Sequence, residues 1–447
     1  MAAAPRTIAE AAVALRSGDA TALDLVNAAL QAIEHHNPRT NAFIRVYADE
    51  ARAAARVVDE ERARGVDRGP LHGIPISLKD LIDVAGQPTS AGSRVLDGRV
   101  ATQNAPVVTR LHEAGAVIVG RTNLHEFALG TTSEDSAFGP VRHPADPARS
   151  PGGSSGGSGA AVATGMGLGS IGTDTGGSVR IPAAACGVVG LKPATGEVPT
   201  QGVIPLSWSL DHVGPLARTV QDAAWLWAAM AGQPLGRVTP PTPGSLRLLR
   251  LDGYFGTMTS DVRAAFEGAL EDLRRQGVEI VDASLAGTQQ IAETYVHLIL
   301  PEAAAWHGSA LDARAGDYTP AVRARLESGR AITAVQYLRA RAARRTLRAS
   351  VDAALANGDA LVLPTLPIVA PLLGADDVTL DPGGVRLPVR AAMLRLTQPF
   401  NLTGHPAISI PCGNTREGLP VGAQIVGHRD RTTALLDAAR AVEPCFA

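Results

Sequence analysis

The chain has 447 residues, of which 45% are hydrophobic and 19% charged, and its formal net charge is −2. This composition is sufficient for a large buried core, and 47 glycines and 31 prolines are too few for a low-complexity chain. The charge balance gives no basic footprint for nucleic acid, and no apolar run reaches the roughly 18 residues of a membrane span. Three cysteines do not form a disulfide framework, and no signal peptide precedes them, so we expect a cytoplasmic protein.

Helices are predicted first along the chain. The apolar periodicity of residues 7–64 indicates three helical segments, with caps at Asp19 and Thr21 and a break at Pro38. From Gly73 onward, short apolar runs alternate with helical segments. The runs predicted as strands are 73–78, 116–121, 168–173, 187–192 and 212–217. This alternation predicts an α/β fold whose sheet is covered by helices on both faces.

The second half of the chain begins after a proline-rich break at Thr239–Gly244. Apolar runs at 246–255 and 278–285 flank a predicted helix, and a long helical region follows from about 291 to 355. Three further runs, 359–367, 406–413 and 420–428, are predicted to return to the sheet. We therefore divide the chain into three parts: an N-terminal helical segment (1–65), a core (66–235), and a C-terminal part (236–447) that completes the same sheet and has a helical insertion at about 288–356.

The basic residues are uneven in type. Of the 41 lysines and arginines, only Lys79 and Lys192 are lysines. Arginine keeps its proton in proteins, whereas a buried lysine can lose it and act as a base. The retention of lysine at only these two positions marks them as candidates for chemistry.

The most unusual passage is rich in glycine and serine and spans Ser150–Pro193. A flexible linker is disfavoured because the passage continues into an apolar helix. Gly167, Gly169 and Gly172 match the letters of a dinucleotide fingerprint, but no helix follows them, and neither lysine precedes a Ser or Thr as a P-loop requires. A nucleophile elbow at Gly152–Gly156 stays open, with His405 or His428 as its base.

A fourth interpretation uses two serines together. Ser154 and Ser178 each follow a pair of glycines, and a helix with a return strand between them would bring both to one edge of the sheet. A serine is a poor nucleophile without a neighbouring base, and a lysine can supply one. Lys79 stands at the end of a predicted strand and is the candidate.

The passage from residue 152 to 193 resembles the signature sequence of the amidase signature family. HGIPISLKDLIDVAG (72–86) resembles the lysine motif of that family, and SLDHVGPLARTVQDAA (209–224) its downstream extension. The similarity covers roughly Leu71 to Ala231. It implies a single large domain with a central mixed β-sheet covered by helices on both faces.

The resemblance also implies a Ser–cisSer–Lys triad. Ser178 would be the nucleophile, Ser154 the proton relay, and Lys79 the base, which burial must make neutral near pH 7. The peptide bond before Ser154 would be cis. The backbone N–H groups of Thr175, Gly176, Gly177 and Ser178 would form the oxyanion hole.

The expected reaction is hydrolysis of the C–N bond of small amides through an acyl-enzyme, with esters and carbamates (urethanes) as further substrates. Thr131, Thr132, Leu366 and Phe400 are the candidate substrate-binding residues, and their character suggests an uncharged acyl or aryl substrate. A small-molecule amide is the expected partner, no cofactor or metal is expected, and a homodimer is left open.

Two other functions stay open. One is the glutaminase component, the A chain, of a tRNA-dependent amidotransferase, which normally has Gln where this chain has Ile181. That difference favours a free-standing hydrolase. The other is a non-catalytic binding scaffold, which the filled triad positions disfavour.

Overall fold

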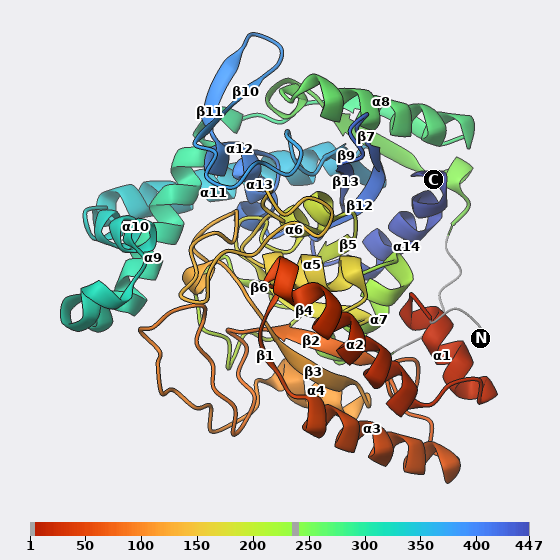
Figure 1. Ribbon diagram of the computed structural model, residues 1–447. Helices are drawn as coiled ribbons and strands as arrows, with labels where there is room; N and C mark the ends of the chain where they lie inside the picture. The colour runs from red at the N-terminus through yellow and green to blue at the C-terminus, as the bar shows by residue number, and fades with distance from the viewer. Residues whose placement is uncertain (1–4, 235–240, 447) are drawn as a thin grey trace.

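A mixed sheet of eleven strands forms the centre of the molecule, in the computed structural model, which describes residues 5–234 and 241–446 (Figure 1). The strand order is β1-β3-β2-β4-β6-β5-β12-β13-β9-β7-β8. These strands are β1 (Phe43–Val46), β2 (Pro75–Lys79), β3 (Val117–Thr122), β4 (Gly169–Asp174), β5 (Val189–Lys192), β6 (His212–Ala217), β7 (Arg247–Leu251), β8 (Glu279–Ala283), β9 (Ala360–Pro364), β12 (Ala407–Asn414) and β13 (Pro420–Val426).

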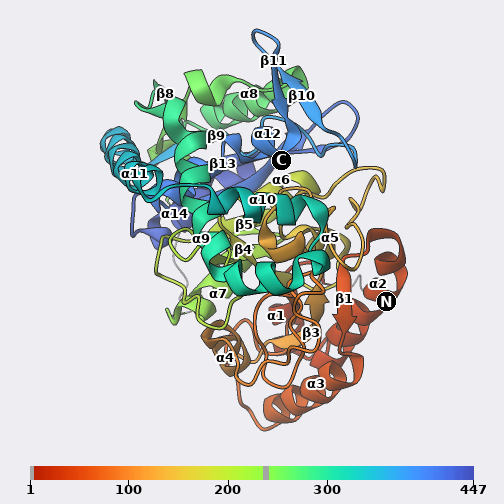
Figure 2. The same cartoon turned by 90° about the vertical axis from the view of Figure 1, so that its left-hand side faces the viewer.

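Helices flank this sheet, as the predicted α/β class requires (Figures 1 and 2). The α-helices are α1 (Ile8–Ser17), α2 (Ala22–Thr40), α3 (Ala48–Ala63), α4 (Pro106–Glu113), α5 (Gly156–Thr164), α6 (Arg180–Cys186), α7 (Val220–Ala231), α8 (Ser260–Arg275), α9 (Ile291–Arg314), α10 (Pro320–Arg330), α11 (Ala334–Leu355), α12 (Val389–Arg395), α13 (Gln398–Thr403) and α14 (Thr432–Val442). Every residue of β2, β4, β5, β6 and β9 is buried, which fits strands enclosed by helices. The predicted fold class is confirmed.

Strands from all three predicted segments join this one sheet. β2 runs parallel to both β3 and β4, so the carboxyl ends of these three strands lie at one edge. β4 and β6 are antiparallel, and the strands from the C-terminal part continue the sheet through the antiparallel pair of β5 and β12. The proline-rich break at 239–244 lies partly outside the described residues.

The N-terminal segment differs from its prediction. The sequence predicts helix throughout residues 7–64, but β1 lies between α2 and α3 and pairs antiparallel with β3. Pro38 does not break α2, which continues to Thr40 and ends at Asn41 in the left-handed conformation. Four residues between two helices are too few for a recognisable strand pattern, so only pairing with β3 defines β1.

The predicted helical insertion corresponds to α9, α10 and α11, which stand on the side of the molecule that faces the viewer in Figure 2. α9 packs against both of the others. A hairpin of β10 (Asp377–Leu380) and β11 (Val385–Pro388) projects at the top of Figure 1 and was not predicted. No helix among the described residues is long and apolar enough to cross a membrane.

Candidate active site

The site is built at the edge of the sheet where β2 and β4 both end. Lys79 is the last residue of β2, and Thr173 lies near the end of the parallel neighbour β4. The Lys79 Nζ atom donates hydrogen bonds to Ser154 Oγ at 2.7 Å and to Thr173 Oγ1 at 2.9 Å. The structure thus brings together the predicted lysine and the first predicted serine, which are 75 residues apart in the sequence.

The charge state of Lys79 follows from its burial. Its side chain is fully buried, and none of the ion pairs among the described residues includes it. Burial lowers its pKa from the usual 10.5 to about 7, although Asp174 and Asp211 act in the opposite direction. Near neutral pH, a large fraction of the side chain is therefore an uncharged amine that can accept a proton.

Ser154 is held by a turn that precedes α5. The peptide bond between Gly153 and Ser154 is cis, as the family resemblance implies. The carbonyl oxygen of Ser154 accepts from the backbone N–H of His125 at 3.1 Å and from the Ser133 hydroxyl at 3.2 Å. The same hydroxyl accepts from the N–H of Gly156. These contacts fix the backbone at Ser154, so its side chain keeps its place beside Lys79.

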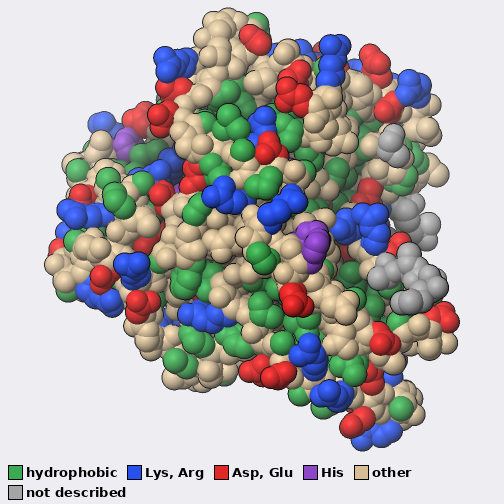
Figure 3. All heavy atoms as spheres, in the orientation of Figure 1, with side chains coloured by type: hydrophobic (Ala, Val, Ile, Leu, Met, Phe, Trp, Pro, Cys, Tyr) green, Lys and Arg blue, Asp and Glu red, His purple; other side chains and the backbone are tan. Residues whose placement is uncertain are grey.

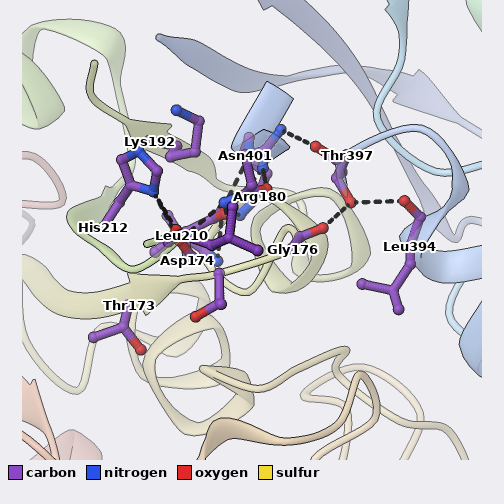
Figure 4. A network of polar contacts seen from close by, with 12 residues as sticks. Thr173, Asp174, Gly176, Arg180, Lys192, Leu210, His212, Leu394, Thr397 and Asn401 are labelled. Atoms are coloured by element: carbon purple, nitrogen blue, oxygen red, sulfur yellow. Dashed lines mark hydrogen bonds and ion pairs between the residues drawn. The ribbon is translucent and has the colours of Figure 1, made fainter. Parts of the chain in front are cut away.

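The loop from β4 to α6 is anchored by a buried ion pair. The carboxylate of Asp174 accepts from Arg180 at 2.9 and 3.0 Å and from Asn401 at 2.8 Å (Figure 4). Burial alone would raise the pKa of Asp174, but the charge and hydrogen bonds of Arg180 hold it well below its usual range. The ion pair orders the loop, because it joins the end of β4 to the start of α6.

Two glycines let this loop approach its neighbours closely. A Cβ atom at Gly176 would overlap the hydroxyl of Tyr295, and one at Gly177 would overlap the hydroxyl of Thr397. The φ of Gly177 is +137°, a conformation that side chains disfavour. The Thr397 hydroxyl donates to the carbonyl oxygen of Gly176 at 2.6 Å, a contact visible in Figure 4. The backbone at this point is therefore fixed from the side opposite to α6.

The loop from β4 to α6 presents several successive backbone N–H groups. Within residues 5–234 and 241–446, no acceptor takes the N–H groups of Thr175, Gly176, Gly177 or Ser178. The next two N–H groups, of Val179 and Arg180, both donate to Asp174. Four successive donors thus stay available at the loop that was expected to form the oxyanion hole.

Ser178 lies beside a small cavity and is 5% exposed. Its carbonyl oxygen accepts from the N–H of Ser155 at 3.2 Å, which joins the two serine segments. The cavity is lined by Ala128, Leu129, Gly130, Thr131, Ser178, Leu206, Tyr295, Ile299, Arg390 and Leu394.

The candidate substrate-binding residues are divided between this cavity and other places. Thr131 lines the cavity, and its buried hydroxyl has no partner among the described residues. The neighbouring Thr132 is half-buried, and its carbonyl oxygen accepts from Ser150. Leu366 and Phe400 are buried in the hydrophobic core and are not part of the cavity wall; Phe400 stacks on Phe255 with ring centroids 6.4 Å apart.

Sequence patterns did not point to Tyr295, Arg390 or Leu394, which belong to α9 and α12. These residues lie in no recognisable motif, and they reach the cavity only because the two helices pack beside it. Thr173 could have been found, since it falls near the end of the predicted strand parallel to that of Lys79.

The second lysine has a different environment. Lys192 is fully buried at the end of β5, and its Nζ atom donates to the carbonyl oxygen of Pro193 at 2.9 Å. Burial and the charge of Arg180 lower its pKa well below the usual value. No serine hydroxyl among the described residues contacts it, so the two lysines of the chain differ in the chemistry that surrounds them.

The face of the molecule that Figure 3 shows has a mixed surface. In Figure 3, acidic and basic side chains are mixed over the visible face, with hydrophobic side chains between them. Among the described residues, no three His, Cys, Asp or Glu side chains converge in a way that could hold a metal ion.

Comparison with known proteins identifies the family to which this chain belongs. A family model described as Amidase matches residues 24–436. The chain belongs to the amidase family, as its resemblance to the amidase signature sequence indicates.

The proteins similar to this chain include both subunits of amidotransferases and amidases. The A-type subunit of the glutamyl-tRNA(Gln) amidotransferase of Chloroflexus aurantiacus is 39% identical, over 94% of this chain and 93% of the relative. A solved structure described as an amidase is 41% identical with a TM-score of 0.92, and the match covers 98% of this chain and 99% of the other. The peptide amidase of Stenotrophomonas maltophilia is 32% identical with a TM-score of 0.82, over 99% and 97% of the two chains.

Proposed function

We propose that this protein hydrolyses the C–N bond of a carboxamide through an acyl-enzyme formed on Ser178. The observation that supports this most directly is the fully buried Lys79, whose Nζ atom is 2.7 Å from Ser154 Oγ and whose pKa is about 7. A lysine that is partly neutral at physiological pH can act as a general base, which an ordinary lysine cannot do.

Proton transfer would proceed from Ser178 to Ser154 and on to Lys79. As Ser178 Oγ attacks the amide carbon, its proton passes to Ser154 Oγ, and the Ser154 proton passes to the lone pair of Lys79 Nζ. When the C–N bond breaks, the reverse transfer delivers a proton to the leaving nitrogen. A water molecule then attacks the acyl ester along the same route, and the acid and free Ser178 are released.

The negative oxygen of the tetrahedral intermediate would bind to the unoccupied N–H groups of residues 175–178. Removal of one such donor in other hydrolases reduces kcat by about 10²–10³-fold. The Asp174–Arg180 ion pair and the close contacts at Gly176 and Gly177 hold these donors in place before the substrate arrives. A preorganised loop of this kind is what oxyanion stabilisation requires.

Labelling with a fluorophosphonate, followed by peptide mapping, tests the proposal without knowledge of the substrate. We expect the label on Ser178, and labelling at least about 10²-fold slower after Ser154→Ala or Lys79→Met. Ser77→Ala is a matched control, because Ser77 is a fully buried serine of β2 that bonds Ser170 at 2.9 Å. A label on Ser154 would favour the nucleophile-elbow interpretation, and absence of both labelling and turnover would favour a binding scaffold.

A second candidate function follows from the curated relatives. Sequence features such as Ile181 favour a free-standing hydrolase of small uncharged amides, but the similarity to the A-type subunits of glutamyl-tRNA(Gln) amidotransferases favours glutamine as the amide and other subunits as partners. Both functions use the same proposed acyl-enzyme. Copurification of the native protein with partner subunits, together with glutaminase activity, would select this second function. A monomer or homodimer with amidase activity on other amides would select the first.

A further inference from the structure

We propose that Arg390 binds a carboxylate on the acyl part of the substrate, so that the preferred substrates are amides of dicarboxylic acids that carry no ammonium group. This inference rests on the proposed function and names the substrate class of the same site. It replaces the uncharged acyl or aryl group that the sequence suggested.

The position of Arg390 in the fold places it beside the nucleophile. Arg390 and Leu394 are four residues apart on α12 and therefore share one face of that helix, which forms part of the cavity wall. Tyr295 and Ile299 have the same spacing on α9 and form another part. Ser178 belongs to the same wall. After the C–N bond breaks, the acyl part stays attached to the nucleophile, so it is the acyl part that occupies this cavity.

The guanidinium of Arg390 has no partner in the described part of the chain. It forms no hydrogen bond and no ion pair with any residue there, and its Nε atom is buried. By comparison, the guanidinium of the fully buried Arg180 bonds Asp174, Asn401 and Gln424. Arg390 is half-buried, and its buried Nε–H without an acceptor is unfavourable; a planar carboxylate is the group that matches the paired donors of a guanidinium.

The charges around Arg390 also favour an anion. Arg325 lies near enough for the two cations to perturb each other, since burial and then the charge of Arg390 lower the pKa of Arg325 to about 10. Arg325 donates to the carbonyl oxygen of Leu129, a residue of the cavity wall. Both arginines keep their charge at neutral pH. The two guanidinium groups therefore place positive charge at this wall of the cavity, and Asp135 offsets part of the charge of Arg325.

The residues that line the cavity, all of them in the described part of the chain, include no aspartate or glutamate. Leu394 and Ile299 present hydrocarbon instead. A substrate ammonium group would lose its hydration in this cavity without gaining a carboxylate partner, and it would be repelled by Arg390. An ω-amide of a simple dicarboxylic acid therefore fits this cavity better than an α-amino acid amide such as glutamine.

The experiment compares three amides of equal chain length on the intact protein: glutaramate, pentanamide and glutamine. Glutaramate has the carboxylate, pentanamide lacks it, and glutamine adds an ammonium group. We expect kcat/KM for glutaramate to exceed that for each of the other two by roughly tenfold or more, the scale of one hydrogen bond to a charged group. The reaction breaks the amide C–N bond and adds water, giving glutarate and ammonia.

The variant Arg390→Gln should lower kcat/KM for glutaramate by about 10- to 100-fold, mainly through KM, and bring the glutaramate-to-pentanamide ratio close to one. Arg390→Lys should restore part of the ratio, since it keeps the charge. Arg395→Gln is the matched control on the same helix: Arg395 stacks on Tyr254 at 3.8 Å and is not part of the cavity wall, so the ratio should not change.

Labelling of Ser178 separates the inference from the proposed function. If Ser178 is labelled but glutaramate is not preferred over pentanamide, or if Arg390→Gln leaves the ratio unchanged, the inference is wrong and the proposed function stands. A clear preference for glutamine over glutaramate also overturns the inference. If no label forms and no amide is hydrolysed, the proposed function fails, and the inference fails with it.

Discussion

Replacement of Lys79 by methionine should make the folded protein less sensitive to acid while it abolishes catalysis. The amine of Lys79 has a pKa of about 7 in the folded protein and an ordinary value of 10.5 when exposed. This difference in pKa corresponds to roughly 5 kcal/mol. Below pH 7, protonation of the buried lysine lowers the free energy of unfolding by about this amount. The sign follows from the direction of the shift, because the unfolded chain binds the additional proton.

The pH dependence of this effect can be worked out from the same values. Between pH 7 and pH 10.5 the unfolded chain holds a proton on Lys79 that the folded protein has lost, so wild-type stability rises with pH in this window. From pH 7 to pH 9 the rise from this one group is roughly 2 kcal/mol, because the folded protein is still half protonated at pH 7. The Lys79→Met substitution removes this pH-dependent contribution to stability. The variant also loses the hydrogen bonds to Ser154 and Thr173, at a cost of about 1–3 kcal/mol that does not change with pH.

The assay is the difference in free energy of unfolding between the variant and the wild type, measured by urea denaturation at pH 6, 7.5 and 9. Titrating groups that do not interact with Lys79 contribute equally to both proteins and cancel. Relative to the wild type, we expect the free energy of unfolding of the variant to fall by roughly 2 kcal/mol between pH 7.5 and pH 9 and to rise by less than about 1 kcal/mol between pH 7.5 and pH 6. Ser77→Ala should give a difference that is flat with pH. A flat difference for Lys79→Met would mean that Lys79 is charged in the folded protein, and the proposed proton route would be lost.

Three other outcomes follow from the site. The rate of fluorophosphonate labelling of the wild type should fall about tenfold for each pH unit below 7, because the neutral form of Lys79 is the active one; a rate that is constant from pH 5 to pH 8 would contradict this. Gly177→Ala should reduce kcat by at least about 10²-fold, since its Cβ atom would displace either the loop or Thr397; unchanged kinetics would show that the N–H groups here do not bind the oxyanion. Asp174→Asn should lower the free energy of unfolding by about 3–5 kcal/mol because it leaves Arg180 buried without a countercharge, whereas Asp377→Asn, which breaks the exposed pair with Arg386, should change it by less than about 1 kcal/mol.

Much of the sheet was predictable because its strands are buried on both faces. The five strands of the core stand out as short apolar runs between glycines and helices, and β2 to β6 lie at those places. β1 escaped prediction because it has four residues, of which only Phe43 is buried, and it pairs only with β3. The order of the strands was equally out of reach, since the return of β12 to pair with β5 depends on contacts between distant segments.

Lys79 could be identified because lysine is rare in this chain and because the residues around it resemble a known motif. Its pKa, however, depends on its burial and on the charges of Asp174 and Asp211, neither of which can be read from the neighbouring residues in the sequence. The sequence indicated which residue could act as a base. The structure supplies the environment that would let it do so.

Arg390 shows the opposite case. It is one of 39 arginines in a chain that uses arginine almost everywhere, and its segment RLPVRAAMLRLT has no motif. Its position distinguishes Arg390 from the many arginines that contact solvent or carboxylates, because α12 packs beside Ser178 and α9. Because arginine is common in this chain, its presence at one position says little about function. The role of Arg390 is therefore inferred from its lack of a hydrogen-bond partner among the described residues. Arg390 lines the cavity at Ser178, where the substrate of the proposed reaction would bind.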